Sequence, residues 1–312
     1  DTFPGDKYDD ATIWKNTNLI ESFVFGIYKG VPYPFQWYVS ESLVDDAVPI
    51  QNDAVVGRVV NGTMTPEEPA AFKDNWAACM ENWWWHYVYS TIRGCNLFFD
   101  KIGIADNTDK QYKEQLTGEV HFLRAYMYYV LMAQYGGVPI IDWVVNIGED
   151  YNIPRNTFEE TINFIVADLD AAMANGRLDK QTDKTRATNG AVMAPKSRVL
   201  LYAASELHHN NGAWTNGYAH PELIGYKNGD RQKLYSEAKK AAEAVMGMGY
   251  ALYNKMPMSP MVNYQQLFLE LHSSEQIFIT KYDKIHPAYW ATDWIAWIYG
   301  PPSFGGWGLN QV

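Results

Sequence analysis

A helix that is apolar on two faces places the strongest limit on how this chain can fold. Its two stripes, between residues 110 and 135, are Leu116, Val120, Leu123, Met127 and Val130, and Phe122, Tyr126, Tyr129 and Ala133. A helix of this kind is covered by neighbours on both sides. It ends at "YGGVP", because Gly136 can adopt a left-handed conformation and Pro139 cannot continue a helix. The chain must therefore supply several packed helices.

Five more helices and a short strand are predicted around it. The helices cover 9–29, 70–100, 188–209 and 230–248, with one more starting after Thr157. Thr157 and Glu160 form a capping box, and Asp230 is placed to act as an N-cap. "QIFITKY" (276–282) is the predicted strand. We therefore predict a mainly α fold, an α-solenoid of tetratricopeptide-like helix pairs with long loop insertions and a short β element near the C-terminal end.

Charge and motif content exclude several classes of function. The net charge of −11 and the absence of a Lys/Arg-rich run argue against a nucleic-acid partner. No apolar stretch approaches the roughly 20 residues that span a bilayer. We found no metal-ligand spacing, phosphate loop or dinucleotide fingerprint, so neither metal nor cofactor is predicted. Cys79 and Cys95 lie on one predicted helix, roughly 24 Å apart, and are interpreted as small buried residues.

Two irregular segments are the candidate binding regions. One is the loop over 31–69, which is rich in Pro, Asp, Asn and Gly; the other is "AYWATDWIAWIYGPPSFGGWG" (288–308). A sugar ring has an apolar face and a hydroxyl rim, so aromatic rings with polar groups at their edges can hold it. Trp294 and Trp297 are interpreted as core. Tyr289, Trp290 and Trp307 form either an exposed platform or a surface beneath a portion of the protein absent from this chain.

The acidic pair Asp45 and Asp46 has three interpretations: a solvated or capping pair, ligand hydrogen bonding, or catalysis. Adjacent residues of an extended loop point in different directions, which makes them a poor general acid and base. We therefore predict no catalytic residues. The alternative to a non-catalytic glycan-binding protein is a glycoside hydrolase of all-α fold. A reducing-sugar assay with a panel of polysaccharides, run beside an affinity gel, separates these two functions.

The stretch "LTGEVHFLRAYMYYVLMAQYGGVPII" (116–141) resembles the signature helix of the SusD/RagB family. The matching residues are Gly118, Glu119, Phe122, Leu123, Arg124, Ala125, Tyr135, Gly136, Gly137, Val138 and Pro139, while Val120 replaces the usual alanine. Other segments resemble the family in order, including "PRNTFEETINFIVADLDAAM" (154–173). Because family members are usually longer, residues 1–312 are predicted to form a single SusD-like domain without its C-terminal portion.

The resemblance implies a non-enzymatic, cell-surface lipoprotein of the Bacteroidetes type. Such proteins sit on the extracellular face of the outer membrane and act as a lid on a SusC-like TonB-dependent transporter, capturing oligo- or polysaccharides for import. The lipid-bearing cysteine would precede Asp1. Some members serve bacteria that use no sugars, so peptide capture is a further alternative.

The resemblance also bears on site residues. "ESLVDDAVPIQND" (41–53) resembles a ligand-contacting loop of the family, so Asp45, Asp46, Gln51 and Asn52 are predicted to bind hydroxyls, with Trp37 as a nearby stacking surface. No tryptophan lies between Asp46 and Asn61, where the family has one, and this argues against a starch-like ligand. By position, Trp307 resembles an aromatic site of the family's C-terminal region, so Tyr289, Trp290 and Trp307 complete the predicted site.

Arg124 is predicted to have a structural role. A guanidinium on a helix packed on both sides is costly to bury without a partner. We therefore expect an acidic or carbonyl partner on a neighbouring helix.

Overall fold

The computed structural model describes nine stretches of the chain, with only the backbone described for 10–11, 76–84, 175 and 180. These stretches are residues 10–31, 61–63, 76–146, 148–149, 152–175, 177–180, 182–209, 218–270 and 273–280. The chain divides into two units, one made of 1–31 with 88–280 and the other of 32–87 with 281–312. All contacts reported below lie within the first unit.

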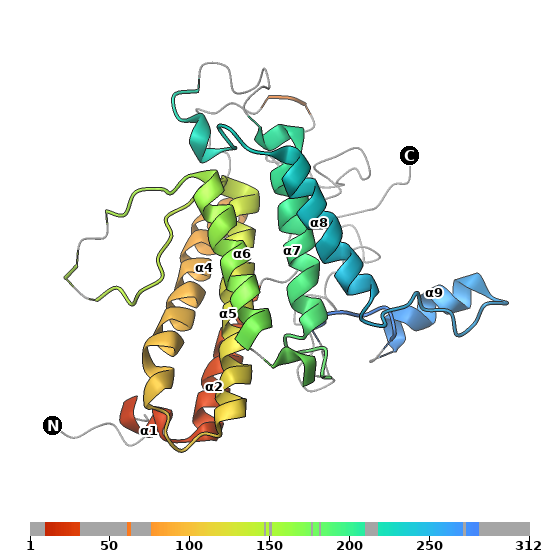
Figure 1. The fold of residues 1–312 in the computed structure, drawn as a ribbon, viewed down its shortest axis with the longest axis horizontal. Helices are drawn as coiled ribbons and strands as arrows, with labels where there is room; N and C mark the ends of the chain where they lie inside the picture. The colour runs from red at the N-terminus through yellow and green to blue at the C-terminus, as the bar shows by residue number, and fades with distance from the viewer. Residues whose placement is uncertain are drawn as a thin grey trace, which may run out of the picture. The chain divides into compact units, whose positions relative to one another are not determined.

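The described residues are mainly helical, as the sequence predicts. The α-helices are α1 (Asp10–Trp14), α2 (Thr17–Tyr28), α4 (Trp76–Lys101), α5 (Lys110–Tyr135), α6 (Phe158–Asn175), α7 (Asn189–Ala204), α8 (Arg231–Met246) and α9 (Pro260–Leu269). Short 3-10 turns are η3 (Ile102–Ile104), η4 (Leu178–Lys180), η5 (Glu206–His208) and η7 (Pro221–Leu223). Helix α5 packs against α2 and α6, and α7 packs against α6 and α8 (Figure 1). Successive helices therefore stack on one another in the tetratricopeptide-like manner.

Helix α5 is the centre of this packing, but its two stripes are covered unequally. In the first stripe Leu116, Val120, Leu123 and Met127 are buried. In the second stripe only Phe122 is buried, Tyr126 and Tyr129 are half-buried, and Ala133 is exposed. The second stripe meets α7 through the rings of Tyr129 and Tyr202, whose centroids lie 6.3 Å apart. Each fully buried large apolar side chain contributes about 1.5–3 kcal/mol to stability, so the first stripe is the dominant packing surface.

The predicted helix ends are explained by local hydrogen bonds. The Thr157 N–H donates to Glu160 Oε2 (2.8 Å) and the Glu160 N–H donates to Thr157 Oγ1 (3.1 Å), which confirms the capping box. The Asp230 side chain accepts from the Lys233 N–H, which confirms that N-cap. Gly136 ends α5 at φ 74° and ψ −130°, the positive φ expected from "YGGVP".

Two predicted helix boundaries were wrong, and one helix was missed. Residues 9–29 form two helices instead of one, because the Asn16 side chain caps the Asn18 and Leu19 N–H groups and starts a new helix. The helix predicted over 188–209 ends at Ala204, and the chain continues through η5 to His209, whose imidazole bonds Ala203 O. Helix α9 was not predicted.

The predicted strand at 276–282 is also wrong over its described residues, 276–280, which adopt no regular strand. The Ile279 N–H donates to Lys184 O (2.9 Å), in a loop that offers no continuous edge for further pairing. Phe278 instead packs edge-on against Phe122, with ring centroids 5.3 Å apart. The apolar residues of this segment therefore cover α5 rather than join a sheet.

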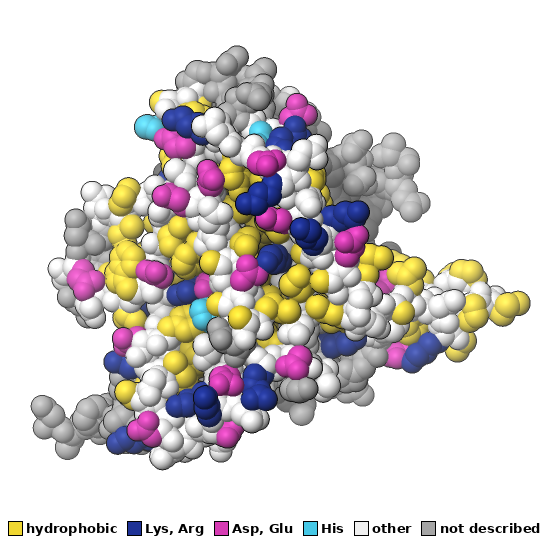
Figure 2. Space-filling model, viewed as in Figure 1, with side chains coloured by type: hydrophobic (Ala, Val, Ile, Leu, Met, Phe, Trp, Pro, Cys, Tyr) yellow, Lys and Arg dark blue, Asp and Glu magenta, His cyan; other side chains and the backbone are white. Residues whose placement is uncertain are grey.

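Helix α9 exposes a hydrophobic surface. Hydrophobic side chains gather over it in Figure 2. The most exposed of them, each more than half accessible, are Met261, Tyr264, Phe268 and Leu269 on the helix and Met258 just before it. The rings of Tyr264 and Phe268 contact each other edge-on, 5.1 Å apart, so the helix covers part of its own apolar surface.

Candidate functional site

The predicted ligand-binding residues lie outside the described residues. They are Trp37, Asp45, Asp46, Gln51 and Asn52 in the first segment and Tyr289, Trp290 and Trp307 in the second. Trp294 and Trp297, interpreted as core, also lie there. What the structure does describe is the scaffold on which both segments begin.

The two segments leave that scaffold at neighbouring positions. The first follows the C-terminal end of α2, at Tyr28, and the second follows residue 280. The rings of Tyr28 and Phe278 contact each other, with centroids 6.4 Å apart. Gly30 packs so closely on α4 that a Cβ at this position would lie 2.3 Å from Thr91 Oγ1. Both departure points are therefore held by tight packing.

A polar cluster with one fully buried carboxylate includes Tyr28, the last residue of α2. We call it the Glu119 cluster; its members are Glu21, Tyr28, Tyr112, Gln115, Glu119 and Arg186. The Glu119 carboxylate, fully buried on α5, accepts two bonds from Arg186 (3.0 and 2.8 Å) and one each from Tyr28 (2.8 Å) and Gln115 (3.1 Å). Four donors occupy its four lone-pair positions. Arg186 Nη1 also donates to Glu21 Oε1 on α2 (2.7 Å).

The cluster includes the loop that precedes α7. The Ala187 N–H donates to Tyr28 Oη (2.7 Å), so the Tyr28 hydroxyl accepts from this loop and donates to Glu119. In the same loop, Lys184 Nζ donates to Ser273 O (2.8 Å) and Lys184 O accepts from the Ile279 N–H. The loop therefore connects α2 and α5 to the segment 273–280.

Burial and ion pairing shift the pKa values of Glu119 and Arg186 in opposite directions. Burial raises the pKa of Glu119, and the hydrogen bonds from Arg186, Tyr28 and Gln115 act to lower it. Burial acts to lower the pKa of Arg186, but its bonds and charge interaction with Glu119 raise it overall. A bidentate arginine and carboxylate pair is among the strongest hydrogen-bonded arrangements in proteins. The Glu119 cluster thus has the properties of a structural ion pair rather than of a reactive site.

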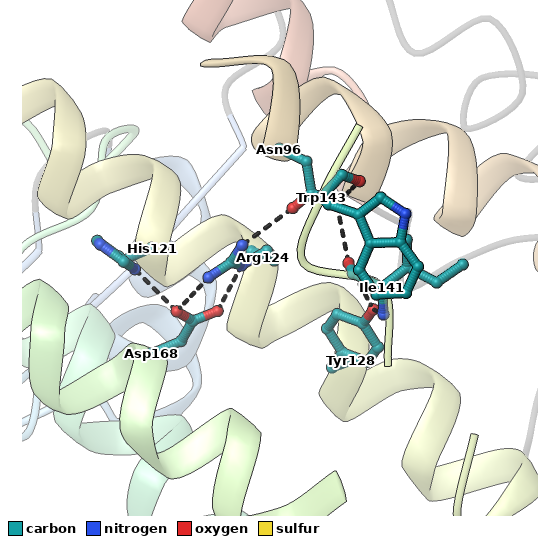
Figure 3. A network of polar contacts seen from close by, with 7 residues as sticks. All are labelled: Asn96, His121, Arg124, Tyr128, Ile141, Trp143 and Asp168. Carbon is teal, nitrogen blue, oxygen red and sulfur yellow. Dashed lines mark hydrogen bonds and ion pairs between the residues drawn. The ribbon is translucent and has the colours of Figure 1, made fainter. Parts of the chain in front are cut away.

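A second buried cluster, the Arg124 cluster of Asn96, His121, Arg124 and Asp168, joins α4, α5 and α6 (Figure 3). Arg124 donates to both oxygens of Asp168 (2.7 and 2.8 Å) and to Asn96 Oδ1 (2.9 Å). The His121 imidazole lies 2.8 Å from the same carboxylate. The guanidinium also lies over the ring of Phe99, 4.5 Å from its centroid. The predicted acidic partner of Arg124 on a neighbouring helix is confirmed.

The same cluster holds the chain that follows α5. Asn96 Nδ2 donates to Ile141 O (2.8 Å) and Trp143 O (3.0 Å), and the Ile141 N–H donates to Tyr128 Oη (2.7 Å), as Figure 3 shows. The side-chain donors of Arg124, Asn96 and Tyr128 bond carboxylate, amide or carbonyl oxygens of the scaffold. The Arg124 cluster is therefore structural, as its sequence position indicated.

The ionisation of Asp168 gives a test of this role. Burial would raise its pKa, but the hydrogen bonds from Arg124 and His121 outweigh burial and the pKa is lowered from 3.8. A carboxyl whose pKa is lower in the folded state stabilises the fold above its ordinary pKa and loses that contribution as pH falls through the folded value. The melting-temperature difference between wild type and Asp168→Asn should be largest near neutral pH and should shrink below about pH 4. Thermal melts from pH 7 to 2.5 test this; a difference independent of pH would contradict it.

The described residues hold no arrangement for metal or thiol chemistry. No group of three or more His, Cys, Asp or Glu in this part of the chain could hold a metal ion. Cys95 is buried, as predicted, and burial raises the pKa of its thiol; the side chain of Cys79 lies outside the described residues. No helix among the described residues is long and apolar enough to cross a membrane.

Sequence reasoning missed the Glu119 cluster. Glu119 was noted only as part of the signature motif. The signal was present: a carboxylate one position before Val120, on a helix with covered faces, needs a buried donor as much as Arg124 needs an acceptor. The partner, Arg186, lies 67 residues away, and no local pattern identifies it.

Comparisons with known proteins agree with the fold. A SusD-like protein of Formosa agariphila is 27% identical over 145 residues, which cover 46% of this chain and 26% of that protein. The crystal structure of a SusD-like protein from Bacteroides fragilis is 26% identical with a TM-score of 0.65, over 89% of this chain and 46% of that one. A SusD-like carbohydrate-binding protein from the same species gives 20% identity and a TM-score of 0.62, over 88% of this chain and 48% of that one.

The chain thus spans about half the length of these solved relatives. The profile of the SusD-like family, described as starch-binding and associating with the outer membrane, matches residues 18–201, more than half of the chain. This stretch contains all members of the Glu119 cluster and of the Arg124 cluster. The chain therefore belongs to the SusD-like family.

Proposed function

We propose that this protein binds oligo- or polysaccharides without cleaving them, on the extracellular face of the outer membrane. It then delivers them to a SusC-like TonB-dependent transporter, and a lipid attached ahead of Asp1 holds it to the membrane. The observation that carries the proposal is the family match over residues 18–201, since that family is described as starch-binding and outer-membrane-associated. That residues 1–312 belong to one SusD-like domain with a further C-terminal portion stays a prediction.

The proposed site consists of the two segments that begin beside the Glu119 cluster. Trp37, Asp45, Asp46, Gln51 and Asn52 supply hydroxyl-binding groups and a stacking ring from one segment. Tyr289, Trp290 and Trp307 supply aromatic surface from the other. Support comes from the neighbouring departure points at Tyr28 and Phe278, because residues carried by two segments can contact one ligand only if the scaffold starts them close together.

The direct test combines binding with catalysis. Full-length protein is run on affinity gels containing soluble starch, which the family description names, or laminarin, which a structural relative sharing the fold is described as binding. A reducing-sugar assay on the same polysaccharides runs in parallel. Retardation without release of reducing ends supports the proposal. Release of reducing ends would establish the hydrolase alternative, and binding to a peptide library without binding to glycans would establish peptide capture.

Trp307→Ala is expected to weaken glycan binding by about ten-fold. Stacking on an aromatic ring contributes about 1 kcal/mol or somewhat more, and 1.4 kcal/mol corresponds to ten-fold in affinity. Calorimetric titration and thermal melting of the same full-length variant measure affinity and stability together. A large fall in melting temperature with unchanged affinity would make Trp307 a core residue and remove it from the site.

A further inference from the structure

The Glu119 cluster and the Arg124 cluster are two similar ion pairs with different surroundings. Each places a buried carboxylate against an arginine through two hydrogen bonds. Each pair also has one member on α5, and these two members, Glu119 and Arg124, lie five residues apart. The Arg124 cluster ties α5 to α4 and α6. The Glu119 cluster instead ties α5 to α2 and to the loop before α7. Among the contacts of the described residues, the Glu119 cluster reaches the first departure point through Tyr28 and the second through Lys184 of the loop that bears Arg186.

The connections from Glu119 to each departure point are short. On one side, the Tyr28 hydroxyl donates to Glu119, and the helix that bears Tyr28 ends at that residue. On the other side, Arg186 is followed by Ala187, whose N–H bonds Tyr28, and is preceded in its loop by Lys184, which bonds Ile279 and Ser273. The guanidinium also lies over Phe25 on α2, 5.2 Å from the ring centroid. One carboxylate therefore fixes the end of α2 relative to the segment 273–280.

We propose that Glu119 and Arg186 are positioning residues for ligand binding, because they hold the ends of α2 and of segment 273–280 in one relative arrangement. This inference rests on the proposed function. A binding surface shared by two segments loses affinity when its parts must be ordered at the moment of binding. The pair acts through the scaffold and does not itself contact the glycan.

The experiment compares Glu119→Gln with Asp168→Asn in the full-length protein. Each change replaces one buried carboxylate opposite an arginine with an amide of the same shape, so both are expected to lower the melting temperature. Affinity for laminarin or soluble starch is then measured well below both melting temperatures and normalised to the folded fraction. Glu119→Gln should bind about ten-fold more weakly than wild type, whereas Asp168→Asn should stay within two-fold of it.

Tyr28→Phe is the second variant, because it removes one hydroxyl and serves if Glu119→Gln does not fold. It breaks the bonds to Glu119 and Ala187 while keeping the ring that contacts Phe278. It should weaken binding about five-fold. Wild-type affinity in Tyr28→Phe and in any folded Glu119→Gln, or an equal loss in Asp168→Asn, would overturn the positioning role.

A ligand-free measurement separates this proposal from the proposed function. Under limited trypsin digestion, Glu119→Gln should be cut several-fold faster than Asp168→Asn between residues 29 and 73 and at Lys281 or Lys284. If the wild-type protein binds neither polysaccharide, the proposed function fails. The trypsin cleavage rates then test by themselves whether Glu119 and Arg186 fix these segments. Equal rates in the two variants would reject the inference.

Discussion

Arg124→Ala is expected to lower the free energy of unfolding by about 3–5 kcal/mol, because it leaves the buried Asp168 carboxylate without its main partner. The same change removes the donor to Asn96, whose amide holds Ile141 and Trp143. Denaturant unfolding of full-length protein measures the loss. Glycan affinity per folded molecule should be unchanged, since this cluster faces α4 and α6.

The matched control for that prediction is Asp170→Asn. Asp170 pairs with Lys196 across α6 and α7, but its side chain is more than half exposed. A surface pair of this kind contributes about 1 kcal/mol or less. An Arg124→Ala variant as stable as Asp170→Asn would contradict a structural role, as would a folded Arg124→Ala variant that had lost glycan binding.

Gly136→Ala should be about as damaging as Arg124→Ala, with an expected loss in the free energy of unfolding of about 2–6 kcal/mol. Gly136 has φ 74° and ψ −130°, a conformation that costs a residue with a Cβ about 1–3 kcal/mol. The added Cβ would also lie 2.4 Å from Leu223 O, a backbone atom of η7, and relieving such a clash typically costs a further 1–3 kcal/mol or so. Denaturant unfolding followed by circular dichroism measures the change.

Gly26→Ala is the control for this glycine. Gly26 lies within α2, and a Cβ there would meet no atom within 4 Å. Alanine is favoured over glycine in a helix by about 0.5–1 kcal/mol, so this variant should be slightly more stable than wild type. If Gly26→Ala and Gly136→Ala changed the free energy of unfolding equally, the requirement for glycine at position 136 could not be attributed to its positive φ and its contact with Leu223.

Elements with strong local signals were predictable from sequence. The extent of α5 follows from its apolar stripe and its end from the glycine after Tyr135. The start of α6 follows from two residues, Thr157 and Glu160, whose bonds depend on nothing outside that turn. Such features are decided within a few residues, so a single sequence contains them.

Features that depend on distant partners were not predictable. Residues 276–280 have the β-branched and aromatic composition of a strand, but no neighbouring strand exists among the described residues for them to pair with, and Phe278 packs on α5. Burial of Arg124 was predictable from its helix, whereas the identity of Asp168, 44 residues away, was not. The ligand-binding residues themselves lie outside the described residues and stay predictions.

Two hydrogen bonds, each joining residues 91 positions apart, have a consequence for evolution. Thr17, the first residue of α2, bonds Thr108 just before α5, and Tyr28, the last residue of α2, bonds Glu119 within α5. These bonds fasten both ends of α2 and do not depend on the length of the chain that connects the two helices. The entropy of closing such a connection grows only with the logarithm of its length, and doubling that length costs roughly 0.6 kcal/mol. Insertions and deletions between residues 31 and 69 are therefore expected to change the stability of the fold only slightly. Relatives can diversify the reach and chemistry of this connection while keeping the same helical frame.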